Sequence, residues 1–254
     1  MITAGVDLGA ETVKMVVLRD GQVLGSSVVR AGLDRRASAE EALEIVLKQS
    51  GLSRGDIKHI TATGIGRKEA GFAQDSVTEI AADARGAAYL FPSVKTVIDV
   101  GAEEARGIRV DGTGKVVDFA KNEKCAAGVG SFVESMARAL ELKLEEMGPL
   151  SLKSQKEIPM NVTCVVFAES EVVSLIHART PKEDIARAIH EAIATRTTSM
   201  VRRVGIEKEV VLIGGVARNP GVVERLRKHL GVDILLPENP QTVGALGAAL
   251  IARG

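Results

Sequence analysis

The feature that most constrains the fold of this chain is a motif that occurs twice. A short apolar segment ends in Asp7-Leu8-Gly9, and a second one ends in Asp99-Val100-Gly101. Each motif is followed by another strand-forming segment, a turn dipeptide (Asp20-Gly21 or Asp111-Gly112) and a third such segment. An internal repeat of this kind predicts two similar α/β domains with a ligand cleft between them.

Periodicity and turn residues predict the other elements. We place the domain boundary near residues 91–95, which gives an N-terminal domain 1–94 and a C-terminal domain 95–254 that carries both cysteines. Ser38 is the expected cap of the first helix, and Gly51 its expected end. Strands are expected at 2–8, 13–18, 22–29, 57–63, 96–100, 106–110, 115–119, 209–213 and 232–235, and helices at 39–49, 78–90, 132–142, 168–177, 184–204, 220–229 and 242–252.

Composition argues against several functions. The chain has 33 Lys+Arg and 33 Asp+Glu, so no net charge attracts nucleic acid or anionic lipid. Aromatic residues make up only 2% of the chain, which leaves few platforms for stacking bases. No apolar run reaches the roughly 18 to 20 residues that span a bilayer, and the N-terminus lacks a signal-like segment. We therefore expect a cytoplasmic protein that binds neither membranes nor nucleic acid.

Glycine turns at strand ends indicate a phosphate site. An Asp-x-Gly turn can direct backbone N–H groups toward an anion while its carboxylate reaches a divalent cation. The segment Ile213-Gly214-Gly215-Val216-Ala217 adds a third glycine turn, and Gly244 and Gly247 give the last helix a small-residue face for tight packing. A single glycine after a strand is most often only a turn residue. The order of these turns and the repeat together favour a nucleotide.

This order of motifs resembles the five-part nucleotide site of the actin, sugar kinase and heat-shock chaperone superfamily. That resemblance implies an α/β fold of two related actin-like (ribonuclease H-like) domains that clasp ATP. The motifs at 62–67, 124–130 and 163–171 resemble one family within it, and the resemblance covers nearly the whole chain. The family comprises the ATP-driven electron activators of 2-hydroxyacyl-CoA dehydratases and the ATPase subunits of benzoyl-CoA reductase.

The resemblance implies a site for ATP and Mg²⁺ built from the strand ends. Asp99 is the candidate catalytic residue, orienting the attacking water, with a role as a simple turn cap as its alternative. Gly214 and Gly215 would border the adenosine. The other candidate binding residues are Asp7, Gly9, Ala10, Thr12, Lys14, Gly101, Ala102, Arg106 and Gly244.

The two cysteines, Cys125 and Cys164, are far apart in the sequence and have no metal-ligand spacing of their own. Taken alone they favour buried free thiols. The resemblance implies instead that each subunit supplies two of the four thiolates of a 4Fe-4S cluster shared across a dimer. The dimer would be a homodimer or a heterodimer with a sister ATPase subunit. Helices predicted after each cysteine would direct their N-termini at the cluster.

Several positions depart from the usual pattern of the dehydratase activators. Gly9 is followed by Ala10, and Gly101 by Ala102, with Arg106 a few residues on. These features and the segment 84–90 look more like the smaller ATPase subunit of benzoyl-CoA reductase. We therefore expect an electron-activating subunit that couples ATP hydrolysis to a benzoyl-CoA reductase module, fed by ferredoxin or flavodoxin. The alternatives are a homodimeric dehydratase activator, a small-molecule kinase and a non-hydrolysing partner that senses ATP.

Overall fold

The computed structural model describes residues 1–122, 129–160 and 165–252. The chain forms two compact units that are discontinuous in sequence. The first comprises Met1–Val97, Val110–Val117 and Pro237–Gly254, and the second comprises Ile98–Arg109 and Asp118–Leu236. The C-terminal segment thus packs in the same unit as the N-terminus. The domains 1–94 and 95–254 that we expect from the sequence are continuous segments, and they stay a prediction.

The first sheet is built around β1 (Ile2–Leu8), whose side chains are mostly buried. Its strand order is β3-β2-β1-β4-β5, with β1 antiparallel to β2 and parallel to β4. In this register Asp7, near the end of β1, lies opposite Lys14 on β2. The other strands are β2 (Thr12–Arg19), β3 (Gln22–Arg30), β4 (His59–Thr63) and β5 (Asp75–Ser76).

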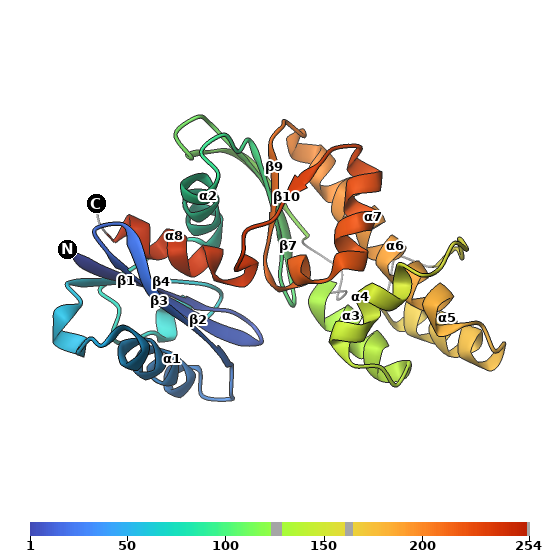
Figure 1. Cartoon of the computed structure of the whole chain (residues 1–254), viewed down its shortest axis with the longest axis horizontal. Helices are drawn as coiled ribbons and strands as arrows, with labels where there is room; N and C mark the ends of the chain where they lie inside the picture. Colours follow the sequence, from blue (N-terminus) through green and yellow to red (C-terminus); the bar gives the residue numbers. More distant parts are fainter. Residues whose placement is uncertain (123–128, 161–164, 253–254) are drawn as a thin grey trace. The chain divides into compact units, whose positions relative to one another are not determined.

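Figure 1 shows α1 (Arg35–Ser50) on one face of this sheet, and α8 (Val243–Ile251) with α2 (Glu79–Leu90) on the other. Helix α1 begins earlier than the sequence predicts. Its cap is Asp34, whose side chain accepts the N–H of Ala37 at 3.0 Å, and the prediction of Ser38 as the cap is wrong. The hydroxyl of Ser38 instead donates to the carbonyl of Asp34, one turn back.

The second sheet repeats the first. Its order is β8-β7-β6-β9-β10, so each sheet places its first strand in the centre, its hairpin partners on one side and its later strands on the other. The internal repeat predicted from the two Asp-x-Gly motifs is confirmed. The strands are β6 (Thr96–Val100), β7 (Ala105–Val110), β8 (Val116–Lys121), β9 (Val210–Ile213) and β10 (Ile234–Leu235).

The second unit is richer in helices. Its core includes Ile185, Ile189 and Ile193, which recur at helical spacing within the helix predicted at 184–204. Helix α4 was not predicted, because Gly148-Pro149 in its middle is usually a helix breaker. No helix within the described residues is long and apolar enough to cross a membrane. The helices are α3 (Val129–Ala139), α4 (Leu144–Ser151), α5 (Val165–His177), α6 (Lys182–Val201) and α7 (Pro220–Leu230).

His190 on α6 gives the fold a specific sensitivity to acid. Burial, and secondarily the charge of Arg225, lowers the pKa of His190 from 6.5 to about 3. The unfolded chain therefore takes up a proton below pH 6.5 that the folded chain does not. The contribution of the neutral imidazole to stability is complete above pH 6.5 and falls by up to about 1.4 kcal/mol per pH unit as the pH drops toward 3.

The expected result is that the free energy of unfolding of the wild type decreases between pH 6.5 and pH 4.5, and that His190→Gln flattens this decrease. Urea unfolding at several pH values measures it. His177→Gln, at an exposed histidine at the end of α5, is the matched control and should keep the wild-type slope. Equal slopes in the wild type and His190→Gln would contradict the prediction.

Candidate functional site

The first Asp-x-Gly turn brings together the residues predicted for it. Lys14 Nζ lies 3.0 Å from Asp7 Oδ2, and both side chains are largely buried. The N–H of Gly9 donates to the carbonyl of Thr12 at 3.1 Å, which closes the turn around Ala10. A Cβ on Gly9 would lie 2.8 Å from Lys14 Nζ, so the ammonium group lies directly beside bare backbone. A cation next to backbone N–H groups is suited to bind phosphate oxygens.

Gly64, just after β4, provides the space for the Asp7 carboxylate. Its φ of +92° is a conformation that side chains disfavour, and a Cβ there would lie 2.5 Å from Asp7 Oδ1. The carbonyl of Leu8 accepts the N–H of Gly66 at 3.0 Å, which fixes the glycine turn against β1. The segment 62–67 is therefore part of this turn.

The second turn has the same construction. Arg106 Nη1 lies 2.6 Å from Asp99 Oδ2, and both residues are buried. The N–H of Gly101 donates to the carbonyl of Glu104 at 2.9 Å, and Ala102 lies within the turn. Arg106 Nη2 also pairs with Glu104 Oε2 at 2.9 Å. The carboxylate of Glu104, which lies in this turn, is thus directed toward an arginine.

Gly214, after β9, corresponds to Gly64. Its φ is +88°, and a Cβ there would lie 2.5 Å from Asp99 Oδ1 and collide with the carbonyl of Val100. Each turn therefore combines a strand-end aspartate, a cation seven residues later and a glycine with positive φ that accommodates the carboxylate. The repeat extends from the order of the strands to the atoms of the site.

Helix α3 begins on the second turn. The N–H groups of Gly130 and Ser131 donate to the carbonyls of Gly101 and Ala102, each at 3.0 Å. A Cβ on Gly130 would lie 2.9 Å from the Gly101 oxygen, so the helix start is in close contact with the turn. A displacement of this turn would act directly on the first residues of α3.

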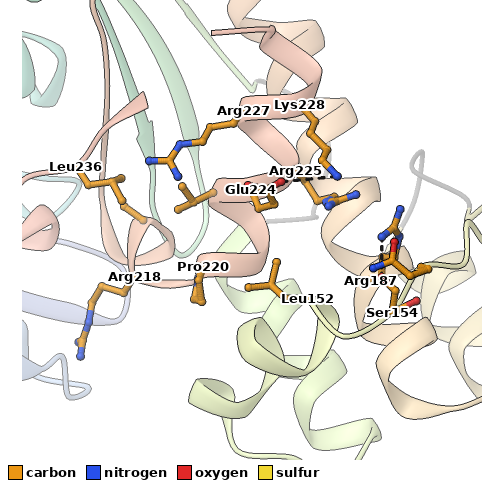
Figure 2. Close-up of a pocket in the computed structure, with 13 residues that line it drawn as sticks. Leu152, Ser154, Arg187, Arg218, Pro220, Glu224, Arg225, Arg227, Lys228 and Leu236 are labelled. Carbon is orange, nitrogen blue, oxygen red and sulfur yellow. Dashed lines mark hydrogen bonds and ion pairs between the residues drawn. The ribbon is translucent and has the colours of Figure 1, made fainter. Parts of the chain in front are cut away.

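Ala217 and Arg218, which follow the Gly214-Gly215 loop, line a pocket of about 510 Å³ within the second unit. Figure 2 shows Pro220 next to Leu152, whereas the side chain of Arg218 points away from them and from the basic side chains of α7. Arg187 on α6 also lines this pocket. Sequence analysis predicted a role for the two glycines but for none of the residues that line this pocket. Those after α4, such as Leu152 and Ser154, come to lie in the same pocket as Arg218 and Pro220 only in the folded structure.

Asp83 is a candidate residue that the sequence reasoning missed. It is a buried carboxylate on α2, and a Cβ on Gly244 would lie 2.9 Å from its Oδ1 and 3.7 Å from Oδ2 of Asp7. Gly244 therefore separates two carboxylates, which explains the need for a glycine there. The only sequence signal was a charged residue among the small residues of the helix predicted at 78–90.

Cys125 and Cys164 lie outside the described residues. The two helices that follow them are present, with α3 starting at Val129 and α5 at Val165. Ser135 Oγ donates to Glu169 Oε1 at 3.0 Å, a contact within the first two turns of each helix. A hydrogen bond therefore joins the middle of α3 to the first half of α5.

The two sheets have the same strand order, each carries an aspartate turn of the same construction, and the chain is similar to known proteins along almost its whole length. The model of the BadF/BadG/BcrA/BcrD ATPase family matches residues 4–252. The chain belongs to this family. It is also similar to a solved structure, the activator of the 2-hydroxyisocaproyl-CoA dehydratase from Clostridium difficile with bound ADPNP. The TM-score is 0.95 and the identity 38%, over 99% of this chain and 94% of that one. The predicted α/β fold of two actin-like units is confirmed.

Two curated relatives of this BadF/BadG/BcrA/BcrD-family chain differ in their identity to it. The activator of lactoyl-CoA dehydratase from Anaerotignum propionicum is 41% identical, over 99% of this chain and 97% of the relative. A benzoyl-CoA reductase subunit from Thauera aromatica is 33% identical, over 98% of this chain and 92% of the relative. The dehydratase activators are thus the more similar of the two kinds.

Proposed function

We propose that this chain is an ATP-hydrolysing activator that supplies electrons to a 2-hydroxyacyl-CoA dehydratase. Identities of 38–41% to dehydratase activators, against 33% to the benzoyl-CoA reductase subunit of Thauera aromatica, favour this function over the benzoyl-CoA reductase role that we expected from the sequence. The residues behind that expectation, Ala10, Ala102, Arg106 and the segment 84–90, are too few to outweigh similarity along the whole chain.

The observation that carries the proposal is the contact between the second turn and α3. The carbonyls of Gly101 and Ala102 accept the first N–H groups of the helix that follows Cys125. A change of nucleotide at this turn would therefore shift the helix start, and a helix start carries partial positive charge. The contact gives a short route from ATP chemistry to the surroundings of a cysteine.

The residues of both turns fit MgATP. Lys14 and Arg106 would supply cations for phosphate oxygens, and Asp7 and Asp99 would supply carboxylates for the water shell of Mg²⁺. Glycine turns leave backbone N–H groups accessible to the phosphates. Within this site Asp99 would orient the attacking water, and Gly214 and Gly215 would border the adenosine.

The donor set of Cys125 and Cys164 fits half of a 4Fe-4S site, and the second half would come from another subunit. The hydrogen bond between Ser135 of α3 and Glu169 of α5 supports a common position for the two cysteines, because each cysteine precedes its helix by only a few residues. A bound cluster would supply a one-electron carrier. The proposed partners are a second copy or a sister ATPase subunit, the dehydratase subunits, and ferredoxin or flavodoxin as the electron donor.

Iron analysis tests this proposal. We expect oxygen-free wild-type protein to contain about four iron and four sulfide per dimer, and Cys125→Ser or Cys164→Ser to contain almost none, because a cluster rarely survives the loss of half its thiolates. His177→Gln, which removes another possible metal ligand at the end of α5, is the control and should keep the iron. Colourless wild-type protein would contradict the proposal and favour a small-molecule kinase.

A non-hydrolysing partner subunit is the second candidate. It is favoured by Arg106, which two carboxylates, Asp99 and Glu104, already hold. Phosphate release by the isolated chain and by the complex with its companions separates the two functions. An activator releases phosphate by itself, whereas an ATP-sensing partner does so only in the complex.

A further inference from the structure

A buried chain of polar groups joins three helices of the second unit through His190. The imidazole is fully buried on α6. Its Nδ1 lies 2.8 Å from Oγ of Ser151, the last residue of α4, and its Nε2 lies 3.1 Å from Nδ2 of Asn219. Asn219 is the N-cap of α7. Buried polar groups that are fully hydrogen-bonded hold their elements in one arrangement.

The hydrogen bonds at the two ends of this chain of polar groups determine which atom donates and which accepts at each step. Asn219 Oδ1 accepts the first N–H groups of α7 at 3.0 and 3.3 Å, so the amide NH₂ of Asn219 faces His190 and donates to Nε2. The neutral imidazole then carries its proton on Nδ1 and donates it to Ser151 Oγ. The Ser151 hydroxyl donates in turn to the carbonyl of Gly148 at 2.8 Å.

Two glycines bring the backbone close to these groups. A Cβ on Gly221 would collide with Ser151 Oγ and would lie 2.8 Å from Cε1 of His190. A Cβ on Gly148 would lie 2.6 Å from Asn219 Oδ1. Because the backbone of α7 approaches the imidazole and the backbone of α4 approaches Asn219 this closely, a shift of His190 cannot be absorbed by empty space.

Asn219 connects this chain of polar groups to the Gly214-Gly215 loop. The loop continues as a 3-10 turn over Gly215–Arg218, and the N–H of Asn219 donates to the carbonyl of Val216 at 2.9 Å. Asn219 thus ends the loop and starts α7 at the same point. The side chain of Asn219 can cap α7 only in the orientation in which its NH₂ group donates to His190 Nε2.

We propose that His190 is a positioning residue for the Gly214-Gly215 loop and acts through Asn219. This inference rests on the proposed function, because it takes the loop to border the adenosine of ATP. A loop held in its binding conformation loses less entropy when the nucleotide binds, so the hydrogen bond between His190 and Asn219 raises nucleotide affinity.

Two substitutions at His190 distinguish its hydrogen bond to Ser151 from its hydrogen bond to Asn219. Asn places its amide nitrogen near the position of Nδ1, which keeps the donor to Ser151 and loses the contact with Asn219. Gln reaches the position of Nε2, which keeps the acceptor for Asn219 and loses the contact with Ser151. Both variants remove one buried hydrogen bond, so both should lower Tm by similar amounts.

The readout is the Kd for ADP, measured by calorimetry on the full chain. We expect His190→Asn to raise the Kd about tenfold and His190→Gln to leave it within about twofold of wild type. Equal Kd values in the two folded variants would overturn the inference, since a merely structural role affects both alike. A wild type that does not bind ADP would instead refute the proposed function, and this is visible without any variant.

A second pair serves if His190→Asn does not fold. Asn219→Ser keeps a good helix cap, but the serine is too short to reach the imidazole. Ser151→Ala removes the hydrogen bonds of Ser151 to His190 and Gly148 and leaves the one between His190 and Asn219. The same split is expected, with a raised Kd for ADP in Asn219→Ser and a nearly unchanged one in Ser151→Ala. Equal values in this pair would also overturn the role of His190.

Discussion

Asp99→Asn is expected to reduce ATP hydrolysis by about 10²- to 10⁴-fold, the usual contribution of a group that positions or deprotonates a reacting water. The amide keeps the shape of the carboxylate but loses the charge that pairs with Arg106 at 2.6 Å. Arg106 keeps Glu104 as a second partner, so the turn should persist. The measurement is phosphate release under saturating ATP and Mg²⁺.

Asp7→Asn and Asp118→Asn complete this experiment. If Asp7 binds through the water shell of Mg²⁺, its substitution should raise the Mg²⁺ concentration needed for half-maximal rate more than it lowers kcat. Asp118 is exposed on β8, where it accepts only its neighbour's backbone N–H among its described contacts, and Asp118→Asn should hydrolyse ATP at the wild-type rate. Hydrolysis by Asp99→Asn at that same rate would remove Asp99 from the catalytic step.

The repeat was the part of the fold that the sequence predicted best. Strand ends at Leu8 and Val100 are marked by local signals, an apolar run and a following Asp-x-Gly, which do not depend on distant residues. Lys14 and Arg106 were named from the family resemblance, and the structure explains their place, because each lies beside the aspartate seven positions before it. Local signals thus marked the two strand ends, whereas the choice of the two cations came from the resemblance.

The remaining features depend on contacts between distant segments. Helix α4 contains Gly148-Pro149, and only packing against α6 and α7 makes this helix stable. Asp83 and Gly64 approach Asp7 from segments that follow it by more than fifty residues, so the place of neither beside Asp7 could be predicted, although Gly64 lies in the motif at 62–67. The cap at Asp34 was missed for a different reason, since Ser38 four residues on is an equally good cap by type.

Packing of α8 gives the largest expected effect on stability. Helix α8 lies so close to α2 that a Cβ on Gly247 would collide with the carbonyl oxygen of Ala82 and lie 2.9 Å from the backbone nitrogen of Gly86. Backbone atoms cannot rotate away as a side chain can, so the helices must separate. Gly247→Ala should therefore lower the free energy of unfolding by about 3 kcal/mol or more, although Ala is intrinsically the better helix former by about 1 kcal/mol.

Urea unfolding measures this loss, with Gly55→Ala as the control because, among the described residues, a Cβ on Gly55 would meet only Ser53 Oγ, at 3.9 Å. The control should stay within about 0.5 kcal/mol of wild type. Gly244, one turn before Gly247, lies between the carboxylates of Asp83 and Asp7, so separation of the helices should also weaken MgATP binding in Gly247→Ala. A stable Gly247→Ala protein with normal affinity for MgATP would show that α8 can move away from α2 without disturbing Asp7.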